Sequence, residues 1–351
     1  MHLPVTTLNA YLYAKMRDGG LSVPCMRHQV GVVYRRRLAK LRLQGDSQVK
    51  SVLNSETTRK LLKRLDVICG PVGPRRNDSK DYWQAQLEKC ALGGISKFQG
   101  KQTSHWMEHP PPYWSGKDYA KAVQLRIGLL PTRGAPYVSS ESGRCRSNAC
   151  EQRETLNHVL QRCPAVHFAR ITRHDKVNKH LKEELEKRRL PVEDAPRVVT
   201  NGDRYVPDLI VVQGDLAHVI ETTVSWEYGD AMQRAYNLKK SKYDQEDIKA
   251  KIHQMYQTSS VTVWPYVIGA RGGWLASNDA MLNEFKPPGT VRKKAVELVI
   301  RGSVKNNEEF MARVWTRPQN KGNGANKRKM KEGQGNPSQA EPAAQPRGTQ
   351  S

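Results

Sequence analysis

Two acidic residues, Asp208 and Glu221, lie beside or within short apolar segments of the sequence. Asp208 directly precedes Leu-Ile-Val-Val, and Glu221 lies inside a second apolar segment at residues 217–224. The Gly-Asp pair between the segments favours a turn, so we predict a hairpin that brings the two carboxylates together. Like charges at strand ends are costly unless a cation lies between them, and hard oxygen ligands favour Mg²⁺ or Mn²⁺.

A helical pattern downstream supplies basic and phenolic groups that suit the same chemistry. Lys239, Lys242 and Tyr243 are spaced i, i+3 and i+4, which places them on one helix face. A lysine beside two carboxylates can position or activate water and offset the developing charge of a phosphate. Each residue alone also fits an ordinary role, such as a strand-end cap or a solvated lysine, so the hypothesis rests on the combination.

Three cysteines and one histidine form a second group with metal-ligand spacing. Cys145, Cys150, His158 and Cys163 read C-x4-C-x7-H-x4-C, and residues 155–163 fit a short helix that presents His158. Zinc takes four such ligands in a tetrahedron, so the pattern predicts a small zinc site whose folding depends on the metal. The alternative is three unrelated buried thiols and a surface histidine. The other cysteines are interpreted as structural: Cys25, Cys69 and Cys90.

The charge of the chain favours a polyanionic partner. The 351 residues include 58 Lys+Arg and 34 Asp+Glu, which gives a net charge of +24 and a pI of about 9.9. Nucleic acids reward such an excess through phosphate neutralisation and counterion release, although solubility alone is the simpler alternative. No apolar run approaches the roughly 18 residues of a spanning helix, and the first residues lack a secretion signal, so we expect neither a membrane protein nor a secreted one.

The hydrophobic periodicity of the sequence and the positions of its prolines predict the elements that must position these residues. Residues 1–70 are basic with a helical pattern, in which Arg35, Arg36 and Arg37 project away from an apolar edge. Direct contact with nucleic acid and an ordinary solvated helix face are both open for these arginines. Prolines at 71–74 and 110–112 interrupt the helices.

Residues 197–270 have a β pattern. The segments 206–212, 217–224 and 261–268 are rich in Val and Ile, and a helical pattern at 230–256 separates the last two. From about residue 315 the chain is rich in Gly, Asn, Gln, Pro and Lys without periodicity, which predicts a disordered basic tail.

The P-D-x12-E hairpin with the following K-x-x-K-Y resembles the restriction-like endonuclease of site-specific non-LTR retrotransposons, in particular the R-two elements of ribosomal RNA genes. Two positions depart from that pattern. Glu221 stands where the family pattern leads us to expect Asp, and Thr223, two residues later, is not the Lys of a PD-(D/E)xK motif. The resemblance therefore implies that the catalytic lysine comes from the helix, as Lys239 or Lys242.

The rest of the chain agrees with this resemblance in order, over about residues 10–310. The cysteine group resembles the CCHC knuckle of the family and is followed by Arg173-His174-Asp175. Residues 17–21, 119–126 and 130–133 resemble the thumb and linker after the reverse transcriptase, and residues 269–274 resemble the segment that closes the nuclease core. The chain has no adjacent Asp-Asp of a polymerase site, so we expect a carboxy-terminal fragment that does not polymerise by itself.

The fold expected from this resemblance is a multi-domain α+β protein with five segments. They are a thumb-like end of the reverse transcriptase at 1–70, a helical linker at 71–140, a zinc knuckle at 141–180, an α/β restriction-like PD-(D/E)xK endonuclease at 195–312 and a disordered tail at 313–351.

The implied function is metal-dependent nicking of a ribosomal-gene target in the nucleus, whose freed 3′-hydroxyl primes reverse transcription of the element RNA. Asp208 and Glu221 would hold Mg²⁺, and the knuckle would hold Zn²⁺. The residues expected to contact DNA or RNA are Arg35, Arg36, Arg37, Arg173 and His174. A non-catalytic zinc-dependent nucleic-acid-binding module is the alternative function, and an inactive remnant with the same residues is a third.

Overall fold

A computed structural model describes residues 9–69, 78–88, 95–98, 100–135, 143–148 and 150–315 of the chain. Contacts group residues 1–316 into one compact unit and residues 317–351 into another. Of the tail predicted at 313–351, residues 313–315 instead end the last helix and the rest lies outside the described residues. The prolines at 71–74, Cys90 and the side chain of Cys69 also lie outside the described residues.

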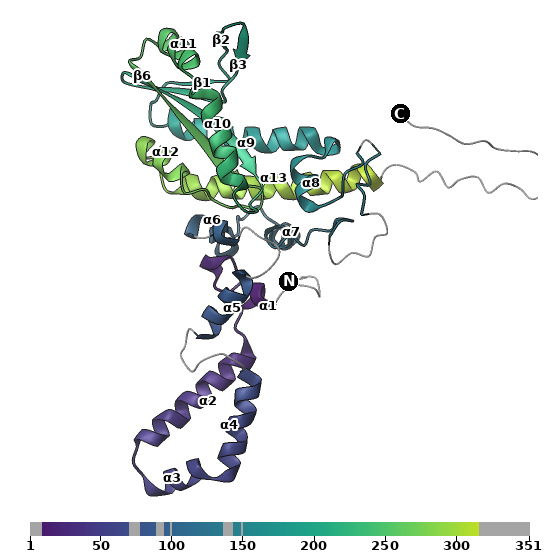
Figure 1. The fold of residues 1–351 in the computed structure, drawn as a ribbon, viewed down its shortest axis with the longest axis vertical. Helices are drawn as coiled ribbons and strands as arrows, with labels where there is room; N and C mark the ends of the chain where they lie inside the picture. The colour runs from purple at the N-terminus through teal and green to yellow at the C-terminus, as the bar shows by residue number, and fades with distance from the viewer. Residues whose placement is uncertain are drawn as a thin grey trace, which may run out of the picture. The chain divides into compact units, whose positions relative to one another are not determined.

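Three helices form a basic hairpin near the start of the chain (Figure 1). They are α2 (Met26–Leu43), α3 (Ser47–Asn54) and α4 (Glu56–Cys69), and each packs against the other two. The Asp46 side chain caps α3 by accepting the amides of Gln48 and Val49. Arg35 of α2 pairs with Asp66 of α4 at 2.5 Å, which ties the two long helices together.

Short helices lie on both sides of this hairpin in the sequence, at residues 9–18 before it and 78–126 after it. They are α1 (Asn9–Tyr13), α5 (Asp78–Glu88), α6 (Lys101–Glu108) and α7 (Gly116–Arg126), together with 3-10 turns at Met16–Asp18 and Ile95–Phe98. Ser115 and Asp118 form a capping box that begins α7, three residues after the prolines that follow α6. Helices α5, α6 and α7 lie within residues 71–140, which we expected to be helical.

The predicted hairpin of apolar strands is the centre of a four-stranded sheet in the order β1-β4-β5-β6. Strand β4 (Leu209–Gln213) pairs antiparallel with β5 (Leu216–Ser225), and Leu209 stands opposite Ile220. Strand β6 (Ser260–Gly269) runs parallel to β5, and β1 (Val192–Asp194) pairs antiparallel with β4. A separate hairpin joins β2 (Val198–Thr200) to β3 (Asp203–Tyr205).

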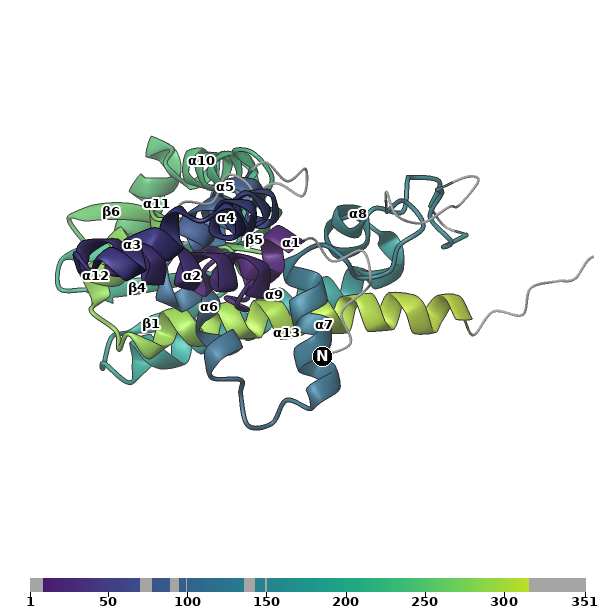
Figure 2. The same ribbon diagram turned by 90° about the horizontal axis from the view of Figure 1, so that it is seen from below.

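Helices cover this sheet and link it to the knuckle segment. The helical pattern at 230–256 forms two helices, α10 (Ala231–Tyr243) and α11 (Glu246–Tyr256), because the chain leaves helical geometry at Asp244 and Gln245. Helix α12 (Asn278–Phe285) packs on β6, and α8 (Leu156–Gln161) precedes α9 (His167–Glu186). The long helix α13 (Thr290–Trp315) lies beside α9 and also contacts α6, α7 and α8 (Figure 2).

One large hydrophobic cluster joins segments that we expected to be separate domains. It contains Tyr11, Val123, Val177, Ile220 and Val299, which come from four of the five expected segments. Because burial of such residues is the main favourable term in folding, these segments are stabilised together. The proposed boundaries at 70, 140, 180 and 312 therefore divide the sequence without dividing this core.

Candidate active site and metal centre

The β4–β5 hairpin brings Asp208 and Glu221 side by side at the end of the sheet. The backbone amide of Asp208 donates to Glu221 Oε1 at 3.2 Å, and the amide of Thr222 donates to Asp208 Oδ2 at 2.8 Å. The Glu221 side chain is 2% exposed, whereas that of Asp208 is 21% exposed. Burial and the negative charge of Asp208 raise the pKa of Glu221, so this pair attracts a positive charge.

Lysine 239 supplies such a charge from helix α10. Lys239 Nζ donates to Glu221 Oε2 at 2.7 Å, while its side chain remains 32% exposed. Lys242 instead donates to the Tyr243 hydroxyl at 3.0 Å and lies over the Tyr243 ring. The structure therefore brings only one of the two candidate lysines to the carboxylate pair.

Tyrosine 243 connects helix α10 to the chain just before the hairpin. Its buried hydroxyl donates to the carbonyl oxygen of Val206 at 3.1 Å, two residues before Asp208. Burial, followed by the charge of Glu221, raises the pKa of this hydroxyl, so it is a neutral hydrogen-bond donor. Tyr243 thus holds the position of Asp208 through the backbone.

Histidine 174 also belongs to this site, although we expected it on a nucleic-acid-binding surface. His174 Nε2 lies 3.2 Å from Asp208 Oδ2 and 3.1 Å from the carbonyl oxygen of Thr222. Hydrogen bonding to Asp208 raises the pKa of His174 to about 9 despite partial burial. The neighbouring Asn178 accepts from the Thr222 hydroxyl at 3.0 Å and fixes the same face of α9 against β5.

Arginine 173 is buried, which corrects our expectation that it contacts nucleic acid. Its side chain donates to Ser303 Oγ, Gln161 Oε1 and the carbonyl oxygen of Leu160, and the residue is only 3% exposed. On the basic hairpin, Arg36 and Arg37 are exposed, whereas Arg35 is half-buried. In the sequence, His174 stood out only as part of the Arg173-His174-Asp175 run. That run does not indicate that His174 would lie beside Asp208.

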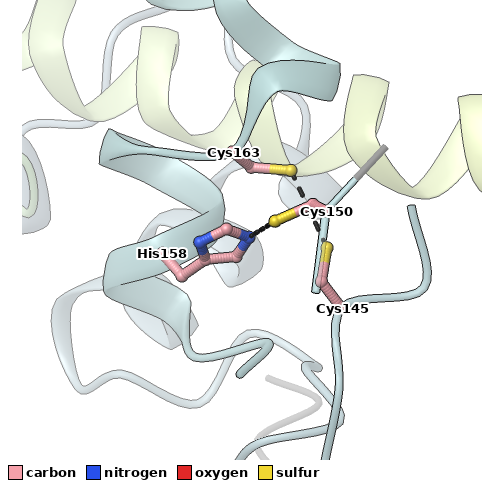
Figure 3. A group of neighbouring side chains, drawn as sticks. All are labelled: Cys145, Cys150, His158 and Cys163. Carbon is pink, nitrogen blue, oxygen red and sulfur yellow. Dashed lines mark hydrogen bonds between the residues drawn. The ribbon is translucent and has the colours of Figure 1, made fainter. Parts of the chain in front are cut away.

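The cysteine group assembles as its spacing predicted (Figure 3). The four ligand atoms of Cys145, Cys150, His158 and Cys163 lie within 4.8 Å of one another. The sulfur atoms of Cys145 and Cys163 are 3.8 Å apart, and Cys150 Sγ is 3.4 Å from His158 Nε2. Tetrahedral zinc with Zn–S bonds of about 2.3 Å would place two sulfurs about 3.8 Å apart, so this donor set fits zinc.

Local contacts orient the four ligands. The Thr155 hydroxyl accepts the His158 amide and caps α8, while His158 Nδ1 lies 3.2 Å from Gln152 Oε1 and leaves Nε2 toward the sulfurs. The completely buried Glu154 accepts the amides of Arg133 and Arg146 at 2.8 Å and pairs with the Arg146 guanidinium. These bonds lower the pKa of Glu154 despite its burial, so it remains a carboxylate that braces the loop.

Comparisons with known proteins relate about nine-tenths of the chain to one group. No family model matches the chain. Two proteins of Popillia japonica, each called a retrovirus-related Pol polyprotein from type-1 retrotransposable element R2, are 32% identical to it. The alignments cover 90% of this chain and 66% and 70% of the respective relatives. The Pol polyprotein from type-2 element R2DM of Drosophila melanogaster is 25% identical over 90% of this chain and 31% of its own length.

The fold and the two residue clusters define a mixed α+β protein with a group that can bind zinc and a separate carboxylate–lysine site. The chain belongs to the family of Pol polyproteins of R2 retrotransposable elements, because it is 32% identical to a member of which it covers 70%. It spans 66% of the first of these relatives, and less of the Drosophila protein.

Proposed function

We propose that this chain is the metal-dependent DNA endonuclease portion of its retrotransposon polyprotein. The observation that carries the proposal is the group formed by Asp208, Glu221 and Lys239 at the end of the hairpin. Two carboxylates with one lysine are suited to hydrolysis of a phosphodiester, and the net charge of +24 suits a nucleic-acid substrate.

Asp208 and Glu221 are the residues that would hold Mg²⁺ or Mn²⁺. Magnesium needs only one or two protein carboxylates because phosphate oxygens and water complete its shell. The carboxylate pair fits this demand. It already faces two cationic side chains, Lys239 and His174, so its surroundings favour positive charge. When bound, such an ion lowers the pKa of water and withdraws charge from the phosphate.

The protein groups around the pair supply positioning and proton control. In the reaction a water oxygen bonds to phosphorus as the bond to the 3′-oxygen breaks, and the proton lost by water is balanced by one gained at the 3′-hydroxyl. Lys239 Nζ, held at 2.7 Å from Glu221 and still partly exposed, would orient the water and offset charge on the phosphate. His174 would keep Asp208 in the geometry that faces Glu221.

The zinc-binding group and the basic helices would hold the substrate. Phosphate contacts fix the register of a protein on nucleic acid without reading its sequence, which suits Arg36 and Arg37 on their exposed helix. Under this proposal the chain acts in the nucleus on a ribosomal RNA gene, and the element RNA is its second partner. Among the residues that the structure describes, no helix is both long and apolar enough to cross a bilayer.

The test is nicking of a supercoiled plasmid that carries a ribosomal RNA gene, with Mg²⁺ as the only divalent ion. We expect wild-type protein to convert the plasmid to open circles and Asp208→Ala to lose at least about 100-fold in rate. Asp203→Ala, at an exposed aspartate of strand β3, is the matched control. Equal nicking by wild type and Asp208→Ala would remove the carboxylate pair from the mechanism.

A non-catalytic zinc-dependent binding module is the competing function, supported by the Cys145, Cys150, His158 and Cys163 group. It predicts nucleic-acid binding that survives Asp208→Ala and Glu221→Ala, disappears with Cys145→Ser and is accompanied by no cleavage with any metal. Filter binding and plasmid nicking on the same preparations separate this module from a nuclease.

A further inference from the structure

A cleft of about 450 Å³ lies between the helix that carries His158 and the connection from β5 to α10. Two aromatic rings, two guanidinium groups and two side-chain amides line it. These groups belong to Trp226, Tyr228, Arg162, Arg234, Asn157 and Gln161. This set differs from an apolar pocket, because it offers stacking faces, positive charge and hydrogen-bonding amides together.

The aromatic wall of the cleft is held in place by a buried carboxylate. Glu227, between Trp226 and Tyr228, is completely buried and accepts the amides of Arg271 at 2.6 Å and Gly273 at 3.2 Å. It also accepts from Arg271 Nε at 3.1 Å. Because Glu227 points inward, its neighbour Tyr228 is left 62% exposed on a loop whose backbone is fixed.

The buried Arg173 holds the opposite wall of the cleft in place from the protein interior. The Arg173 guanidinium donates to Gln161 Oε1 at 3.0 Å, which leaves the amide nitrogen of Gln161 without a hydrogen-bond partner among the described residues. Asn157 and Arg162 line the same wall, and Arg162 is exposed. A ligand with acceptor oxygens or ring nitrogens would satisfy a wall of this composition.

Strand β5 and helix α10 each contribute residues both to the cleft and to the site of Glu221 and Lys239. Val224 of the cleft follows Glu221 by three residues along β5, a separation of about 10 Å at roughly 3.3 Å per residue. Arg234 of the cleft precedes Lys239 by five residues on α10, or about 7.5 Å. With about 3.4 Å per stacked nucleotide, these two offsets correspond to about two to three nucleotides of one strand.

We propose that this cleft binds an unpaired nucleotide of the DNA strand that is cut at Asp208 and Glu221, an assignment that rests on the proposed endonuclease function. The base stacks on Tyr228, its phosphate lies between Arg162 and Arg234, and the amides of Asn157 and Gln161 face its edge. Aromatic stacking and arginine contacts of this kind bind single strands with little sequence preference. The cleft therefore makes the protein prefer a locally opened duplex to a fully paired one.

The experiment measures binding without cleavage. Fluorescence anisotropy in EDTA-free buffer with Ca²⁺ in place of Mg²⁺ compares the full chain on two probes, a 30-base-pair duplex and the same duplex with three unpaired nucleotides at its centre. We expect wild type to prefer the opened duplex, and Tyr228→Ala to lose that preference by at least about fivefold. Tyr228→Phe should retain it, because the ring remains.

Matched controls keep the result interpretable. Tyr113→Ala removes another exposed tyrosine, which lies far from Tyr228 in the sequence. This variant should keep the preference for the opened duplex. Plasmid nicking by wild type and Asp208→Ala tests the nuclease proposal separately, so failure of the nuclease proposal and failure of the cleft proposal give different results. Equal thermal melting and zinc content of Tyr228→Ala and wild type show that the variant is folded.

Two outcomes would overturn the proposal. One is loss of affinity in Tyr228→Ala that is equal on both DNA probes, which assigns Tyr228 to general duplex binding. The other is displacement of the opened duplex by a single-stranded RNA of the same sequence at concentrations well below those of the matching DNA strand, which assigns the cleft to RNA.

Discussion

The two candidate lysines of α10 take different partners although they stand three residues apart. Lys239 reaches Glu221, whereas Lys242 reaches the Tyr243 hydroxyl. The difference follows from helix geometry, since positions three apart on a helix differ by about 60° in direction. If the carboxylate pair is catalytic, only one of these lysines should matter strongly to the chemical step.

We therefore predict unequal losses when each lysine is removed. Lys239→Ala should lower the initial nicking rate by about 100-fold, because an acid–base or charge-offsetting group contributes roughly 10² to 10⁴. Lys242→Ala should cost less than about tenfold, because among the described residues its ammonium is hydrogen-bonded to the Tyr243 hydroxyl and not to either carboxylate. Single-turnover nicking with Mg²⁺ measures both, with the exposed Lys240→Ala as control. A larger loss in Lys242→Ala would reverse the assignment.

Glutamate 297 on α13 makes stability depend on pH. Burial raises its pKa to about 7 although Lys294 Nζ lies 2.7 Å away, and burial also lowers the pKa of Lys294, so the environment opposes both charges. The unfolded-state pKa is the ordinary 4.5. Between these values the folded protein keeps a proton that the unfolded chain releases, so the stability present below pH 4.5 is lost as pH rises through 7.

Replacement of the Glu297 carboxyl by an amide should remove this loss of folding stability at high pH. Glu297→Gln should be more stable than wild type at pH 8 by about 1 kcal/mol, a figure discounted for solvent screening, and the gain should vanish near pH 4. Urea denaturation at a series of pH values measures the difference, with Glu308→Gln on the same helix as control. A gain that is independent of pH would contradict titration of Glu297 as its cause.

At the scale of elements, the helix α8 and its flanking loops are too small to bury a core of their own. Their buried residues include the cysteines themselves, which pack against Phe310 of α13. Metal binding in such a segment contributes folding free energy. Removal of one ligand should therefore change both the metal content and the order of the segment.

We predict that Cys145→Ser lowers bound zinc from one equivalent to well below a half. Three remaining ligands would hold the ion far more weakly, and residues 143–166 should lose protection from hydrogen exchange. Zinc is measured by a colorimetric chelator after denaturation. Cys25→Ser, at a buried cysteine outside the group, is the control. A full equivalent of zinc in Cys145→Ser would exclude this cluster as the metal centre.

Local patterns in the sequence predicted the hairpin, the cysteine cluster and the types of most elements. The apolar segments and the Gly-Asp turn of the β4–β5 hairpin are local, and the ligand spacing of the cysteine group spans only nineteen positions. His174 could not be assigned in this way, because its partner Asp208 lies 34 residues later and meets it only after α9 packs on the sheet. The break at Asp244 also escaped prediction, since the residues around it keep helical periodicity.

At the scale of the whole molecule, a buried arginine joins the helices before the knuckle to the loop after β6. Arg126 of α7 is 2% exposed, and its Nε donates to the carbonyl oxygen of Arg271 at 3.0 Å. Its guanidinium also donates to the carbonyl oxygen of Thr103 and lies 4.3 Å from the centre of the Phe98 ring. No pattern in the sequence distinguishes Arg126 from the many exposed arginines, because its partners are 23 to 145 residues away.

We predict that Arg126→Met separates the unfolding of these regions. Loss of the guanidinium removes the Arg126 donor from the buried carbonyl of Arg271 and one of two side-chain donors from the carbonyl of Thr103, which should cost about 3 kcal/mol. Wild type should unfold in one urea transition because its segments share a core, whereas the variant should show an earlier transition at the tryptophans of residues 78–114. Arg133→Met, at an exposed arginine, is the control. A single unchanged transition would mean that the shared core suffices.

Glycine 302 on α13 allows a close approach whose effect reaches the carboxylate pair. A Cβ at this position would lie 2.5 Å from Arg173 Cγ, so any side chain must push α9 away from α13. Arg173 is followed directly by His174, which contacts Asp208. If the proposed cutting site is correct, selection for DNA cutting also acts on residue 302, 94 positions after Asp208, and a change from glycine to alanine there would inactivate an element copy without altering any residue of that site.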